Sequence, residues 1–275
     1  MQSTVSEPQA LSVTDILDTS FRLYRKHFWT YLAIIMIIEI PVLILLGIVA
    51  SISNNELITF QDFFTFISRN MTQFFFLTNL VTFQPIAALI IILLMLLLQI
   101  RIGVLINATA QVYHTGSTSA TQAYRVPIVP IIVIGVLGLI STVLSIIPFL
   151  PVLLALPFVC VYQIVLLEKP NPFTAIARNW YLIQGSILRI VGLMFLLFIL
   201  EQVLQAIPSS LFAYMWSLAG LWEILTWVVA AFGYVISLLL LSFSTIVFTL
   251  LYFELRARRD GYDLEHKAQQ HFARS

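Results

Sequence analysis

Four polar side chains inside the long apolar runs of this 275-residue sequence are candidates for a functional site. They are Glu39, Gln99, Arg101 and Glu201. A charged group in membrane hydrocarbon is a functional candidate, because its desolvation is costly and has to be offset by a partner. Two interpretations fit Glu39 and Arg101: a site for a lipid headgroup, an ion or a proton, or a structural ion pair that joins two helices. Glu201 lies nearer the outer end of its run, where its carboxylate can reach the membrane interface.

Depth along the helices favours contact between Glu39 and Arg101. Glu39 lies about ten residues into the first apolar run, hence ~15 Å from the inner end at 1.5 Å per residue. The next run passes back in the opposite direction, so Gln99 and Arg101 reach a comparable depth. Pro41 leaves the carbonyl of Ile37 without its helical donor, which adds an acceptor nearby. We therefore predict that Glu39 and Arg101 pair and neutralise each other.

The residue patterns of common catalytic and metal sites are missing from the sequence. The four histidines have no metal-ligand spacing with one another or with Cys160, the single cysteine. Neither a Gly-x-Ser-x-Gly elbow nor a glycine-rich phosphate loop is present. The apolar runs and their connections leave no room for a soluble catalytic domain. We predict that the protein is not an enzyme and has no catalytic, cofactor-binding or metal-binding residue and no cofactor.

Composition indicates which elements must position these residues. Hydrophobic residues make up 60% of the chain and charged residues 10%, against ~45–50% and ~25% in soluble domains. This excludes an ordinary soluble enzyme, a disordered chain and a coiled coil. Because a membrane helix needs ~20 apolar residues, we predict one all-α, polytopic membrane domain over residues 1–275 with six transmembrane helices. The predicted spans are residues 29–52, 85–110, 130–147, 152–167, 186–207 and 228–255.

Short amphipathic helices are predicted before the first, third and fifth spans. In residues 11–28 the apolar side chains recur at three- and four-residue steps, which is typical of a helix that lies in the membrane surface. Residues 117–124 and 172–182 have the same position relative to the spans that follow them. The third and fourth spans have an alternative, a re-entrant hairpin, because no charged residue marks their turn at 148–151.

The remaining connections also carry structural signals. Residues 53–84 are rich in phenylalanine, and we expect an outer segment that lies on the outer leaflet or caps the bundle. Pro208 is expected to close the fifth span. Residues 211–227 are amphipathic and Trp-rich, which places them at an interface. Residues 256–275 are predicted to form a cytoplasmic tail.

Basic residues predict the orientation of the chain. Thirteen of the 14 Lys and Arg residues lie on one side, twelve of them flanking the spans and Arg101 in the cytoplasmic half of the second span, and only Arg69 lies on the other. Because basic flanks mark the cytoplasmic side, we predict an even number of spans, two cytoplasmic termini and a multi-pass location in the plasma or inner membrane. On that side basic residues can contact anionic lipid. The candidates are Arg22, Arg25, Lys26, Arg256, Arg258 and Arg259.

Three segments resemble one bacterial membrane family. The matching residues are 11–18 with 21–28 (LSVTDILD and FRLYRKHF), 175–182 (AIARNWYL) and 251–265 (LYFELRARRDGYDLE). They are similar to a six-span family of unknown function that includes the membrane domain of glycerophosphoryl diester phosphodiesterases. The resemblance implies a six-span fold but no activity. The phosphodiesterase domain itself begins with His-Arg-Gly, and no histidine here is followed by arginine.

Two functions from different classes fit these observations. The first is a non-enzymatic membrane component that acts as a scaffold or accessory subunit or binds lipid. The second is a small transporter or permease for a lipid-like or amphiphilic solute, with Glu39 and Arg101 at its site. The expected partners are membrane lipids, and a second membrane or cytoplasmic protein is a further candidate. A net charge of +1 gives no reason to expect nucleic acid.

Overall fold

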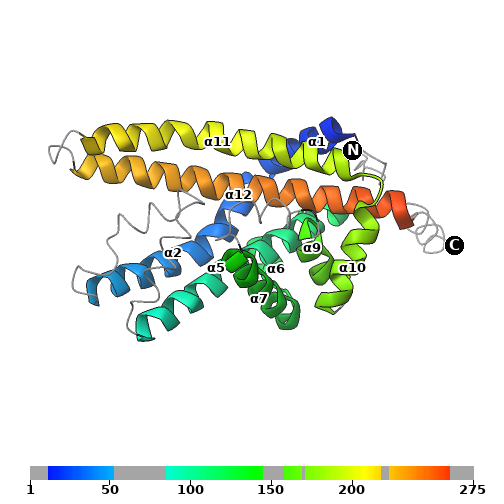
Figure 1. Ribbon diagram of the computed structural model, residues 1–275, viewed down its shortest axis with the longest axis horizontal. Coiled ribbons are helices and arrows are strands. Elements are labelled where there is room, and N and C mark those ends of the chain that lie inside the picture. Colours follow the sequence, from blue (N-terminus) through cyan, green and yellow to red (C-terminus); the bar gives the residue numbers. More distant parts are fainter. Residues whose placement is uncertain are drawn as a thin grey trace.

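The computed structural model describes residues 12–52, 85–144, 156, 158–168, 171–217 and 223–260. Throughout these ranges the regular elements are helices, with no strand, which confirms the predicted all-α class (Figure 1). The predicted outer segment at 53–84 and residues 261–275 of the predicted tail lie outside the described residues. The described helices are α1 (Val13–Lys26), α2 (Phe28–Ile52), α5 (Pro85–Thr115), α6 (Ala120–Ala123), α7 (Ile128–Leu144), α9 (Val161–Leu167), α10 (Pro172–Ile183), α11 (Ile187–Ser217) and α12 (Glu223–Asp260).

The N-terminal amphipathic helix forms where the sequence predicts it. Ser12 caps α1: its hydroxyl accepts a hydrogen bond from the backbone N–H of Asp15, and the Asp15 carboxylate accepts one from the backbone N–H of Ser12. After a turn at His27 the chain continues directly into α2. Ile16 is fully buried, and α1 packs against α12, where the Tyr24 and Phe243 rings lie 6.0 Å apart. The apolar face of α1 is therefore covered by protein in part, since Phe21 remains 56% exposed.

Helices α11 and α12 form a long antiparallel pair (Figure 1). Helix α11 runs through Pro208 to Ser217, although the apolar stretch long enough to cross a membrane ends at Pro208, where the fifth span is predicted to close. A proline inside a helix costs one backbone hydrogen bond, and a neighbouring helix can offset this by packing against the ring. Here Gly233 of α12 provides the space: a Cβ atom at Gly233 would lie 3.1 Å from Cβ of Pro208. Residues 211–217, which are predicted as the start of an interfacial segment, therefore continue α11.

Helices α2 and α5 form a second antiparallel pair, which diverges from the first in Figure 1. Helix α5 is longer than predicted and ends at Gly116, whose φ of 77° permits the left-handed conformation that closes a helix. The following amphipathic segment is helical only over the four residues of α6. Asn107 of α5 donates to the carbonyl of Ala123, and Tyr124 donates to the carbonyl of Ile34 in α2. These bonds fix α6 across both helices of the pair.

Residues 130–167 contain a turn within the fourth span, which the sequence predicts to be short and kinked at Pro157, a residue outside the described ones. Helix α7 matches the third predicted span closely, but α9 covers only seven residues, and Val159 and Cys160 form a turn before it. The side chain of Asn179 in α10 satisfies the backbone at this turn. It accepts from the N–H of Cys160 at 3.0 Å and donates to the carbonyl of Leu156 at 3.0 Å. The predicted turn at 148–151 lies outside the described residues.

Three described stretches are long and apolar enough to cross a membrane: Phe28–Leu45, Ile187–Pro208 and Ala231–Asp260. Helix α7 adds a shorter apolar stretch, Val129–Gly138. The composition is that of a membrane-embedded protein. Burial is uneven, since half of the α12 stretch is buried inside the protein against 17% of the α11 stretch. Helix α12 is thus the packing centre, and α11 shows most of its apolar surface to the surroundings.

Candidate functional site

The deep cluster consists of Glu39, Arg101 and Tyr234, which come from α2, α5 and α12. The predicted contact between Glu39 and Arg101 is present: Nη1 of Arg101 forms an ion pair with Oε1 of Glu39. Tyr234 donates a hydrogen bond of 2.5 Å to Oε2 of the same carboxylate. Glu39 has no exposed surface. Each oxygen of one buried carboxylate therefore contacts a different neighbouring helix.

This geometry neutralises Glu39 and ties three helices together at one depth. The arrangement is favourable in a low-dielectric interior, because each charge has a partner and the carboxylate also accepts a hydrogen bond. The Arg101 side chain retains 18% exposure, and its Nε has no hydrogen-bond acceptor among the described residues. The same geometry therefore holds the helices in register and leaves one donor of Arg101 unused.

The other predicted intramembrane residues do not join the deep cluster. Gln99 packs against Gly138 of α7, so closely that a methyl group at Gly138 would overlap its side chain. Glu201 is half-buried on α11. Near it, Gln205 donates a hydrogen bond of 2.5 Å to Ser237 and so joins α11 to α12. Gln99 and Gln205 each connect one pair of helices.

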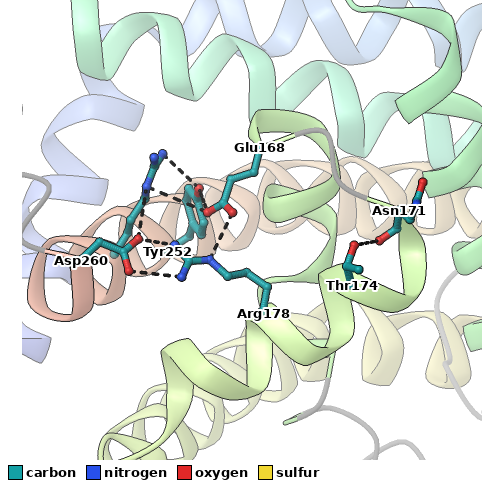
Figure 2. A network of polar contacts seen from close by, with 7 residues as sticks. Glu168, Asn171, Thr174, Arg178, Tyr252 and Asp260 are labelled. Carbon is teal, nitrogen blue, oxygen red and sulfur yellow. Dashed lines mark hydrogen bonds and ion pairs between the residues drawn. The ribbon is translucent and has the colours of Figure 1, made fainter.

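The end cluster is a second polar network, at the end of the molecule where α9, α10, α11 and the last turns of α12 meet. Its members are Glu168, Arg178, Arg189, Tyr252, Glu254, Arg256, Arg258 and Asp260. Figure 2 shows Arg178 between the carboxylates of Glu168 and Asp260, with the Tyr252 hydroxyl pointing at Glu168. Arg178 Nε lies 3.2 Å from Glu168, and Tyr252 donates to Glu168 at 2.9 Å. These contacts hold α10 to α9 and α12.

Arginines of α12 complete the end cluster. Arg256 lies 3.9 Å from Glu168 and 3.8 Å from Asp260. The buried carboxylate of Glu254 pairs with Arg189 of α11 at 2.7 Å and with Arg258. Every carboxylate of the end cluster thus contacts two guanidinium groups.

The electrostatic environment of Arg178 reflects this pairing. Burial alone would lower the pKa of its guanidinium group, but hydrogen bonds and charge from Asp260 and Glu168 raise the pKa overall. Arg178 therefore remains a fixed positive charge between two acidic groups.

The residues predicted to contact anionic lipid fall into two groups. Arg22, Arg25 and Lys26 lie exposed on α1, with Arg22 3.6 Å from Asp18. The three on α12 make contacts within the chain: Arg256 and Arg258 belong to the end cluster, and Arg259 donates to the carbonyl of Gln184. The sequence prediction missed these contacts because it ended the last span at residue 255, whereas α12 remains helical to Asp260.

Two further residues were not singled out in the sequence. Tyr234 reaches Glu39 from a helix 195 positions away in the chain. Asn179 is fully buried and bonds the backbone at the Val159–Cys160 turn. Tyr234 gives no signal in an apolar run, because tyrosine is common at such positions. Asn179 gives a weak one, as an amide among the apolar residues of a short amphipathic helix.

Comparison with known proteins adds no relative: no protein-family model, curated protein or solved structure matches the chain. Within the described residues no three His, Cys, Asp or Glu side chains gather closely enough to hold a metal ion. The candidate sites of the described chain are therefore the deep cluster and the end cluster.

Proposed function

We propose that the chain is a six-span, non-enzymatic protein of the bacterial inner membrane that serves as a lipid-contacting scaffold or accessory subunit. The apolar stretches in α2, α11 and α12 supply three of the proposed spans. Helix α5 supplies a fourth, because its 31 residues extend ~46 Å at 1.5 Å per residue, which is enough to cross a bilayer. Helix α7 and the segment that ends in α9 supply the remaining two spans. The resemblance of three segments to the membrane domain of glycerophosphoryl diester phosphodiesterases supports the same assignment.

The proposed orientation places the end cluster on the cytoplasmic side. Helix α1, helix α10 and the last turns of α12 gather at one end of the molecule (Figure 1). The basic residues of α1 and α12 lie at this end, and basic flanks remain cytoplasmic during insertion. Both described ends of the chain then face the cytoplasm.

One observation carries the scaffold function: apolar side chains point outward while the deep charges point inward and are paired. On α11 the exposed residues include Phe195, Phe198 and Ile207, and lipid is the solvent that such a surface requires. Glu39 has both oxygens engaged by neighbouring helices. A carboxylate enclosed in this way supports a structural role for the deep cluster.

A transporter or permease for an amphiphilic solute is the second candidate, and one observation favours it. Arg101 keeps 18% of its side chain exposed, and its buried Nε has no acceptor among the described residues. A phosphate or carboxylate group of a solute could contact the exposed part of this side chain. The two functions therefore differ in whether Arg101 binds a ligand.

Lipid mass spectrometry separates the two candidates. The protein would be extracted from native membranes in polymer-bounded nanodiscs, as wild type and as Arg101→Lys. The lysine variant keeps a positive charge for Glu39 but removes Nε and the planar fork. The scaffold function predicts the same lipid profile for both proteins. A lipid species enriched with the wild type and lost from Arg101→Lys would instead support the transporter and overturn the structural role of the deep cluster.

A reporter at the C-terminus tests the topology. A fluorescent protein fused after Ser275 should fluoresce, and alkaline phosphatase at the same point should be inactive, because six spans return the chain to the cytoplasm. An active phosphatase there would contradict the six-span proposal.

A further inference from the structure

Helix α10 is amphipathic with its polar side turned inward. Arg178 and Asn179 point into the protein, where Arg178 joins the end cluster and Asn179 bonds the backbone of the Val159–Cys160 turn. The opposite face is apolar and open. Phe173 is 86% exposed, Trp180 46% and Tyr181 43%. These residues and the exposed Ala177 lie at three- and four-residue steps, so they form one stripe along the helix.

Helix α1 shows the opposite arrangement. Its apolar face, with the buried Ile16, packs against α12, and its exposed face carries charged residues such as Asp18 and Arg25. Apart from Phe21, which is 56% exposed, the outer surface of α1 is polar and can face water. The α10 stripe, in contrast, needs an apolar environment, because the aromatic side chains of Phe173, Trp180 and Tyr181 would otherwise face water.

Continuity with α11 indicates lipid as that environment. The turn from α10 to α11 is short and contains Gly185, whose φ of 83° permits the tight reversal. Helix α11 starts immediately after this turn, and its second residue, Leu188, is 87% exposed. Because only 17% of the apolar α11 stretch is buried, its outer surface faces lipid in the proposed function. The α10 stripe therefore adjoins the point where a lipid-facing helix begins.

A positive charge at the same place indicates an anionic surface. Arg178 and Arg256 share the carboxylates of Glu168 and Asp260. Arg259 instead binds the carbonyl of Gln184. The guanidinium carbons of Arg178 and Arg259 lie 5.3 Å and 5.6 Å from the centre of the Tyr181 ring. Among the described residues Arg259 has no carboxylate partner. Its charge is thus available to a phosphate beside the aromatic stripe.

We propose that the stripe of Phe173, Ala177, Trp180 and Tyr181 lies in the boundary between headgroups and acyl chains of an anionic leaflet, with Arg259 at the level of the phosphates. Tryptophan and tyrosine favour this boundary because their rings are apolar and their N–H or O–H groups need polar partners. This inference rests on the proposed function, since it requires a membrane-embedded chain. It adds a specific lipid-contacting element and the charge class of the lipid.

Spin-label accessibility tests the position of α10. Because Cys160 is the only cysteine and is buried, single cysteines can be introduced in a Cys160→Ala background. Three labelled variants of the full chain would be reconstituted in vesicles of phosphatidylcholine and phosphatidylglycerol: Ala177→Cys on the stripe, Asp18→Cys on the exposed face of α1 and Phe198→Cys on the lipid-facing side of α11. Oxygen reports lipid contact, and a water-soluble nickel chelate reports water contact.

The inference predicts that labels at 177 and 198 collide mainly with oxygen and the label at 18 mainly with nickel. Water contact at 177 with lipid contact at 198 would overturn the α10 inference alone. Water contact at both 177 and 198 would overturn the proposed membrane function as well. Shielding of 177 from both reagents would show that a protein covers the stripe, which also overturns the inference.

Lipid selectivity tests the role of Arg259. With spin-labelled lipids, the wild type should prefer phosphatidylglycerol to phosphatidylcholine, and Arg259→Gln should reduce this preference by up to about fivefold, the effect of one basic residue at an anionic surface. Arg258→Gln removes the same charge from an arginine that pairs with Glu254, and a smaller loss is expected. Equal losses in the two variants would show that only net charge matters and would overturn the assignment of Arg259.

Discussion

The deep cluster and the end cluster both hold helices together, but they differ in the number of guanidinium groups that each carboxylate contacts. In the deep cluster one carboxylate, Glu39, meets one guanidinium group, Arg101, and one phenol, Tyr234. In the end cluster each carboxylate contacts two guanidinium groups. The deep carboxylate is completely enclosed, and so is Glu254 of the end cluster, whereas the side chains of Glu168 and Asp260 keep 18% and 22% exposure.

The difference shows how the cost of a charge depends on its surroundings. Deep in the bundle neither water nor a headgroup can replace a lost partner, so a one-to-one pair has no reserve. At the end of the bundle a carboxylate that loses one arginine keeps the other, and water can solvate the partly exposed Glu168 and Asp260. The deep cluster is therefore suited to fixing helix register, and the end cluster to holding α10 at a polar boundary.

The largest expected effect is at Glu39. Glu39→Leu leaves Arg101 buried without a counter-charge, and a guanidinium group cannot lose its proton. We expect the free energy of unfolding to fall by about 3–5 kcal/mol. Arg101→Met should lower the free energy of unfolding by less than Glu39→Leu does. The remaining Glu39 carboxylate can take up a proton and keep its hydrogen bond to Tyr234. Unfolding of the purified protein in mixed micelles with rising dodecyl sulfate content measures both changes.

The double variant and a surface control complete this test. Glu39→Leu with Arg101→Met should recover most of the loss, since no unpaired charge remains. Phe198→Ala shortens an exposed side chain of α11, outside the packed interior. It should change the free energy of unfolding only slightly. A double variant as unstable as Glu39→Leu alone would contradict the one-to-one description of the deep cluster.

The Glu39–Arg101 contact could be predicted because it depends on two consecutive antiparallel helices, for which depth follows from counting residues. Tyr234 could not, since its contact depends on how α12 packs against a helix far away in the chain. The reach of α11 through Pro208 depends on the space at Gly233 in another helix. The inward polar face of α10 depends on the turn at Val159–Cys160, which Asn179 bonds. Local periodicity predicts the elements, but long-range packing decides which face each one buries.

A medium effect is expected at Arg178, the guanidinium group shared by Glu168 and Asp260. Arg178→Met removes hydrogen bonds to both carboxylates, but Arg256 remains near each of them. Hydrogen bonds to charged groups contribute about 1.5–3 kcal/mol, and partial exposure and the remaining arginine should reduce the loss to roughly 1–2 kcal/mol. The same unfolding assay measures it.

Salt separates the two clusters in this comparison. High salt screens partly exposed charges but not fully enclosed ones. The destabilisation by Arg178→Met should therefore shrink when the assay is repeated at high salt, while that by Glu39→Leu should stay. An equal response of both variants to salt would show that the two clusters do not differ in solvent access.

The smallest effects are expected within the end cluster, at the two arginines that share Glu254. Arg258 is the more exposed, at 42% of its side chain, and pairs one turn away on its own helix, so Arg258→Gln should cost about 0.2–1 kcal/mol. Arg189 reaches the fully buried carboxylate from α11 and is 21% exposed, so Arg189→Gln should cost more than Arg258→Gln. Removing both would leave Glu254 without a guanidinium partner, as Arg101→Met leaves Glu39, and the combined loss should exceed the sum of the two single losses. A strictly additive result would mean that neither arginine substitutes for the other, and the redundancy that distinguishes the end cluster from the deep cluster would be absent at Glu254.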